Sequence, residues 1–199
     1  MKKIILLFMS FLVCVSCQSQ EKTDLEKTDF SKSYKEIFKN VKFQTESREI
    51  TTTLPIAYTK NVGVFKFGNI DFKNSAENSI KSSTVGILIN NIENRQTKGI
   101  KIEIEETSIG YNLFTYLKSQ YGSPKILSEL PKKNREGKTL GNSAYSWNIK
   151  DKTIVFVQFY EYTNNKPNVS SILYIVDNKI MCVGLQETVS SHILRTFTQ

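Results

Sequence analysis

The chain has 199 residues, a formal net charge of +8 and 39% apolar residues. This length suits one folded domain or two small fused halves, and no apolar stretch after the N-terminal one is long enough to cross a membrane. One histidine and three cysteines argue against a zinc site and a disulfide framework, and we expect no metal and no cofactor.

The N-terminal residues have the composition of an export signal. Lys2 and Lys3 form a basic start, residues 4–13 form an apolar run, and the small residue Ser16 precedes Cys17. The run 4–15 is about 18 Å long as a helix, too short to span a hydrocarbon core of ~30 Å. Residues 1–16 are therefore predicted to be a cleaved signal.

This segment resembles a bacterial prolipoprotein signal, whose lipobox ends in a small residue and a cysteine. Val15, Ser16 and Cys17 match its last three positions, whereas Cys14 stands where an aliphatic residue is usual. The resemblance implies that Cys17 becomes the acylated N-terminus. Several acyl chains on one residue anchor a protein stably, whereas a single chain does so only marginally. The resemblance also implies residence in the cell envelope of a Gram-negative-type bacterium, at the periplasmic or surface face of the outer membrane.

Residues 17–29 are predicted to be a tether that joins this anchor to one globular domain, 30–199. The near-repeat Glu21–Leu25 and Glu26–Phe30 dominates the segment. Its polar and charged composition cannot bury enough surface to fold alone.

Positive charge gathers in the run 132–138, which contains Lys132, Lys133 and Arg135. The run is expected to be a solvated loop. Because an exported protein rarely meets nucleic acid, the expected partner is an anionic glycan, a lipid headgroup or an acidic protein, and not nucleic acid. Cys182 is the cysteine left after processing, and its apolar neighbours predict a small buried hydrophobe.

Apolar residues at helical spacing predict helices over 29–40, 107–121 and 187–197. Gly122 and Pro124 supply the stop signal of the second helix. Strands are predicted at 49–58, 62–72, 83–90 and 98–105 in the first half of the chain, and at 144–149, 153–162, 171–176 and 179–185 in the second. Alternation of isoleucine with charged residues in 98–105 is typical of an antiparallel strand with one wet face.

The order of these elements is helix, four strands, helix, four strands. It predicts an α+β fold in which helices cover one face of an antiparallel sheet, with two consecutive halves, 30–106 and 107–199, as an open alternative to one undivided unit. A helix that ends at Gly122-Ser123-Pro124 before the aromatic strand Tyr145-Ser146-Trp147 resembles the β-lactamase-inhibitor-like and small outer-membrane lipoprotein domains, over about residues 108–185. A shared fold carries no function by itself.

The residues give no catalytic constellation. His192 is the sole histidine, and its sequence neighbours Ser190 and Ser191 do not face it on a helix. A pair of glycosidase carboxylates cannot be recognised in one sequence, because their separation is a three-dimensional quantity. No catalytic residue is therefore assigned.

Aromatic strands are the remaining signal for binding. Tyr145, Trp147, Tyr160 and Tyr162 are candidate contacts, since tyrosine and tryptophan are favoured binding anchors. Core packing is the competing interpretation.

The leading hypothesis is a lipid-anchored, non-catalytic binding or accessory module for an envelope protein or glycan. The alternatives are an inhibitor or immunity lipoprotein and a small envelope hydrolase that uses acidic residues.

Overall fold

The computed structural model describes residues 21–46, 48–74, 81–129, 131–163 and 166–198. The signal segment 1–16 and Cys17 lie outside these residues, so the leader and the acylation remain predictions.

The helices are α1 (Tyr34–Ile37), α2 (Thr107–Tyr121) and α3 (Val189–Phe197), with two 3₁₀ turns, η1 (Leu25–Lys27) and η2 (Val62–Val64). The strands are β1 (Thr23–Asp24), β2 (Gln44–Glu46), β3 (Ile56–Thr59), β4 (Phe65–Phe67), β5 (Ile70–Asp71), β6 (Thr84–Ile89), β7 (Thr97–Ile104), β8 (Lys125–Glu129), β9 (Lys132–Lys133), β10 (Thr139–Ile149), β11 (Lys152–Thr163) and β12 (Lys166–Asp177).

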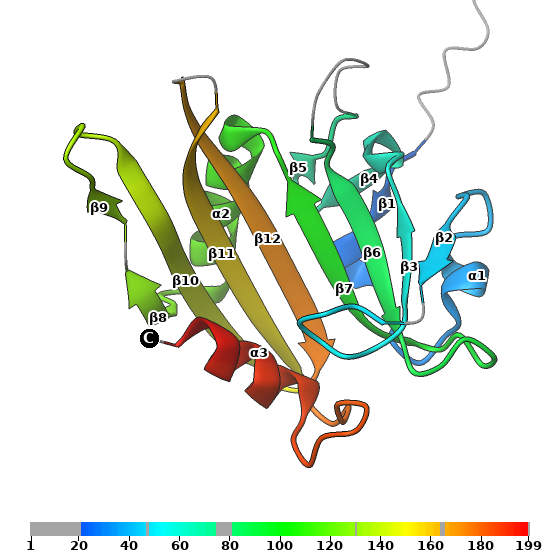
Figure 1. Cartoon of the computed structure of the whole chain (residues 1–199). Coiled ribbons are helices and arrows are strands. Elements are labelled where there is room, and N and C mark those ends of the chain that lie inside the picture. The colour runs from blue at the N-terminus through cyan, green and yellow to red at the C-terminus, as the bar shows by residue number, and fades with distance from the viewer. Residues whose placement is uncertain (1–20, 47, 75–80, 130, 164–165, 199) are drawn as a thin grey trace, which may run out of the picture.

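A large antiparallel sheet forms the centre of the molecule. Its strand order is β2-β3-β6-β7-β12-β11-β10-β8, and β9 pairs with β10 outside this path (Figure 1). Strands of the first half of the chain lie on one side, and strands of the second half lie on the other. They meet where β7 pairs with β12, with Ile100 opposite Ile175. The α+β class with a large antiparallel sheet is confirmed, whereas the predicted order of four strands in each half is not: among the described residues, seven strands precede α2 and five follow it.

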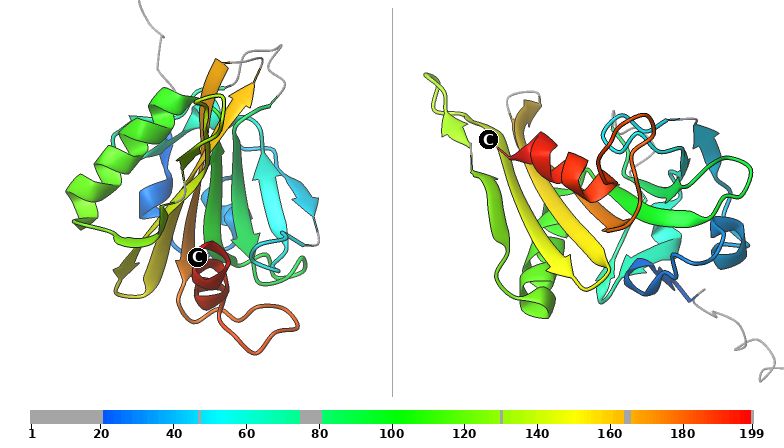
Figure 2. Two further views of the ribbon diagram at one scale, coloured as in Figure 1. Left: turned by 60° about the vertical axis from the view of Figure 1, so that its left-hand side comes forward. Right: turned by 90° about the horizontal axis from the view of Figure 1, so that it is seen from below.

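The two faces of the sheet are covered differently. On one face, Leu113 and Leu117 of α2 pack with the inward isoleucines of β7 and with Phe156 of β11. The other face is covered by α3 (Figures 1 and 2), whose Val189 and Ile193 belong to a second apolar cluster. The prediction that the helices share one face therefore holds for α1 and α2 but not for α3. The cause is that β11 carries apolar side chains on both faces, and each face needs a cover.

A small three-stranded sheet, β1-β4-β5, lies on the α2 side. Its first strand, β1, runs parallel to β4 and belongs to the segment predicted to be a tether. Leu25, just after β1, is 1% exposed. The prediction of a tether is therefore wrong from Thr23 onward. The prediction rested on the polar composition of the segment as a whole. Each repeat nevertheless contains one apolar residue, and both of these residues, Leu25 and Phe30, are buried.

The first predicted helix is much shorter than the apolar stripe suggests. The carboxylate of Asp29 accepts the backbone N–H and the hydroxyl of Ser31, at 2.9 and 2.7 Å, which forms a turn in place of a helix start. Ser33 then caps α1, and the N–H of Tyr34 donates to the carbonyl of Arg95. These contacts tie the backbone to the loop that precedes β7, and only four residues become helical.

The predicted strand 179–185 is a loop. Both edges of β12 are already paired, with β11 and with β7, so the sheet offers no place for it. The alternation is present, since Cys182 is buried whereas Met181 and Val183 are 48% and 58% exposed, but among the described residues the segment pairs only through an isolated bridge between Met181 and Thr188.

Candidate functional site

The basic run 132–138 forms a hairpin, not an open loop. β9 pairs with the start of β10, and the side chain of Asn134 accepts the N–H groups of Glu136 and Lys138 at 3.0 and 2.9 Å. Gly137 has φ of +76°, a conformation that glycine adopts without strain. These contacts order the backbone from which the basic side chains project.

Most of the hairpin's positive charge faces solvent without compensation. Lys132, Lys133 and Arg135 are exposed. No carboxylate of the described residues lies within ion-pair distance of any of these three. Glu136 is bonded instead to Lys138, with 2.9 Å between the ammonium and the carboxylate.

Two of the predicted aromatic residues lie beside this hairpin. Tyr160 and Tyr162 are at the far end of β11, and both are partly exposed. The ammonium of Lys138 lies 5.5 Å from the ring centre of Tyr162, a cation–π contact. Gly141 is directly opposite Tyr160 and has no side chain with which to cover the tyrosine ring. We call these residues, Lys132, Lys133, Arg135, Lys138, Tyr160 and Tyr162, the hairpin tip.

The other two predicted contacts belong to the core. Trp147 is 5% exposed, and its indole N–H donates to the carbonyl of Gly122 at 2.9 Å. The ring of Tyr145 lies 4.6 Å from that of Phe114 on α2, between centroids. Both side chains pack beneath α2, so they are unsuited to contact a partner, and the competing interpretation of core packing is correct for them.

A charged cluster lies on the α3 side of the sheet. The Lys101 ammonium is 3.0 Å from a carboxylate oxygen of Glu49 and 2.8 Å from one of Glu103. It also lies 5.9 Å from the ring centre of Tyr174. The segment around Glu49 covers Lys101, whose side chain is only 15% exposed. The face of β7 predicted to be wet is therefore partly covered.

This cluster borders a cleft of about 220 Å³ but does not suit acid–base catalysis. Burial opposes ionisation of Glu103, yet its hydrogen bond to Lys101 and the lysine's charge outweigh this, and its pKa is lowered. Burial raises the pKa of Glu105, the next carboxyl on the same strand face, but Glu105 does not line the cleft. A glycosidase that works by paired carboxylates needs a protonated carboxyl beside the ionised one in the same cleft.

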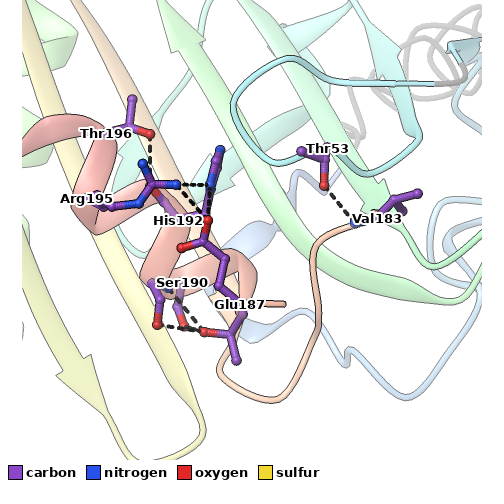
Figure 3. A network of polar contacts seen from close by, with 9 residues as sticks. Thr53, Val183, Glu187, Ser190, His192, Arg195 and Thr196 are labelled. Carbon is purple, nitrogen blue, oxygen red and sulfur yellow. Dashed lines mark hydrogen bonds and ion pairs between the residues drawn. The ribbon is translucent and has the colours of Figure 1, made fainter. Parts of the chain in front are cut away.

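The residues around His192 form a surface network at the start of α3 (Figure 3). One carboxylate oxygen of Glu187 lies 2.7 Å from His192 Nδ1 and 2.6 Å from Arg195 Nη2. The hydroxyls of Ser190 and Ser191 contact Thr188, at 3.0 and 2.9 Å. These serines therefore serve the helix start, where Thr188 is the N-cap, and do not form a nucleophile–base pair.

Cys182 lies close to this network but is not activated. It is buried, as predicted, and burial raises the pKa of its thiol. A nucleophilic cysteine needs the opposite shift.

Comparison with known proteins gives no relative: no family model, no curated protein and no solved structure matches the chain. The likeness to β-lactamase-inhibitor-like domains therefore stays a prediction. Within the described part of the chain, no helix is long and apolar enough to cross a membrane. Those same residues contain no group of three His, Cys, Asp or Glu side chains placed to hold a metal ion.

Proposed function

We propose that the chain is a lipid-anchored, non-catalytic binding module of the cell envelope, which offers the hairpin tip to an acidic envelope protein or glycan. The observation that carries this proposal is that two groups of residues, which the sequence suggested separately as binding residues, lie at one place in the structure. An exposed basic hairpin and two partly exposed tyrosines come together at one end of the sheet. Basic and aromatic side chains are the usual anchors for anionic and ring-shaped partners.

The position of the hairpin tip agrees with an anchor at Cys17. The described chain begins beside β1 and β4, at the same end of the sheet as β9 but across the sheet from it (Figures 1 and 2). Cys17 precedes the first described residue by four positions. An acylated Cys17 would therefore hold the hairpin tip on the membrane side of the molecule, where an envelope-bound partner is within reach.

Charge neutralisation at the hairpin tests the binding role. The triple variant Lys132→Gln, Lys133→Gln, Arg135→Gln should fold normally, because all three side chains are exposed, and should lose its partner in a pull-down from intact envelopes. A matched control removes three exposed lysines elsewhere: Lys35→Gln, Lys39→Gln, Lys179→Gln. Equal capture by both variants and by the wild type would mean that the hairpin is not the binding surface.

The captured partner also separates the alternatives. A toxin or enzyme would support the inhibitor or immunity hypothesis, whereas a structural protein or a glycan would support an accessory role.

Replacement of Cys17 tests the anchor. Cys17→Ser should release the protein from membranes and abolish labelling by a radioactive fatty acid, whereas Cys14→Ser should change neither. A Cys17→Ser protein that stays in the membrane fraction and still takes up label would refute the proposed acylation.

A further inference from the structure

A second pocket lies at the opposite end of β10 and β11 from the hairpin tip. It has a volume of about 270 Å³ and opens beside the turn Lys150–Lys152. Its inner wall consists of the buried side chains Phe67, Ile154 and Ile175, with Ile149 nearer the mouth. The pocket is therefore apolar inside and charged at its rim.

Two acidic side chains, Glu26 and the exposed Asp151, line the pocket, and Glu26 is already bonded to the protein itself. The two carboxylate oxygens of Glu26 accept the hydroxyls of Tyr116, at 2.7 Å, and of Tyr121. Burial and the neighbouring Glu26 raise the pKa of Tyr116 to about 12, so that its hydroxyl stays protonated and donates. Glu26 is thus engaged in holding η1 against α2 and is a poor acceptor for a cationic ligand.

The basic side of the rim retains binding capacity. The half-buried Lys152 ammonium donates to the carbonyl of Thr28 at 3.3 Å and lies 4.2 Å from the ring centre of Phe30. No carboxylate among the described residues is within ion-pair distance of it. An ammonium has three donors, and only one is used here. Burial lowers the pKa of Lys152 and outweighs the opposing effect of the charges on Asp29 and Asp177, which lie beyond ion-pair distance.

We propose that this pocket binds a short aliphatic carboxylate, with its chain against Ile149, Ile154 and Ile175 and its carboxylate at Lys152. An anionic head supplies the ion pair that Lys152 lacks, and an aliphatic body matches the inner wall. The volume is slightly below the range of about 300–1,000 Å³ usual for ligand pockets, which favours a short chain. The site is independent of the hairpin tip and of any partner bound there.

Trp147 provides a built-in reporter for this pocket. It is the only tryptophan of the chain, and it lies on the same face of β10 as Ile149, two residues away. Octanoate is a suitable probe, with octanol as its uncharged analogue. The full chain carrying Cys17→Ser removes the competing acyl chains of the anchor.

Octanoate should change the fluorescence of Trp147 saturably and should shift the methyl NMR signals of Ile149, Ile154 and Ile175. Lys152→Gln should weaken octanoate binding about tenfold or more, the size expected for loss of one charged hydrogen bond, and should leave octanol binding unchanged. Lys166→Gln, an exposed lysine at the far end of the same β11–β12 hairpin, should have no effect.

Two results would overturn the proposal. One is the absence of shifts at the three isoleucines when the wild-type protein is titrated with octanoate. The other is equal affinity of the wild type for octanoate and octanol. This result would show that Lys152 does not bind the carboxylate, and it can be obtained even if the Lys152→Gln variant does not fold.

Discussion

At the scale of single residues, Lys101 is the best-placed side chain for a structural test. Glu49 is only 7% exposed, and its second oxygen already accepts the N–H of Thr52 at 2.6 Å. Lys101→Met would leave this carboxylate buried without its cation. We expect a loss of about 3 kcal/mol in the free energy of unfolding, the lower end for a broken buried ion pair. Urea denaturation measures it, with Lys98→Met on the same strand as the control.

The same cluster predicts how stability depends on pH. The pKa of Glu103 is lowered in the folded protein, so its contribution is present above its ordinary value of 4.5 and is lost as the pH falls through the folded value. The pKa of Lys101 is raised: burial opposes its charge, but Tyr174, Glu103 and Glu49 outweigh burial. Its contribution is therefore present below 10.5 and is lost only at higher pH. Glu103→Gln should flatten the acid limb of a curve of stability against pH. The free energy of unfolding of this variant should fall less between pH 8 and acid pH than that of the wild type. An unchanged acid limb would show that other carboxylates control it.

At the scale of elements, the N-terminal segment behaves as part of the fold. Leu25 is buried in the main core, and Glu26 bonds two tyrosines of α2. Leu25→Ala should cost about 3 kcal/mol of stability, because it removes a fully buried side chain and leaves a cavity. Lys27→Ala, whose side chain is 80% exposed, is the control and should change stability by less than about 0.5 kcal/mol. Thermal melts distinguish this from a tether, for which neither change would matter.

Element prediction succeeded where periodicity was long and unbroken. The span of α2 is as predicted, and β6, β7 and α3 lie within about two residues of the expected ranges. The predictions of a helix start at 29–33 and of a strand at 179–185 were wrong for a different reason. The apolar spacing of both segments is real, but the competing partners are a side-chain turn at Asp29 and a sheet edge already occupied by β7. The turn at Asp29 is a local Asp-to-Ser31 contact that competes with the helix start, whereas the occupied sheet edge depends on distant strands and is not visible in local sequence.

At the scale of the whole molecule, the candidate surfaces depend on strand register. The basic run and the aromatic strand were each recognisable from sequence, but their meeting follows from the pairing of β10 with β11, which places Gly141 opposite Tyr160. The same pairing continues to Ile149 and Lys152 and so builds the rim of the apolar pocket at the other end. Glu26 and Tyr121 reach that rim from distant parts of the chain, and no sequence pattern links them.

The join between the two halves gives the last prediction. The main core contains residues from both, and α2 of the second half packs on the small sheet of the first, with the rings of Tyr116 and Phe67 6.0 Å apart. A separated half would expose the apolar strand β7 or β12 as an unpaired edge, which is a site for aggregation. Fragments 21–106 and 107–199 should therefore each lack a cooperative thermal transition, and their mixture should regain one. Cooperative unfolding of either fragment alone would show that the halves are separate domains and that the contact between them is not needed for folding.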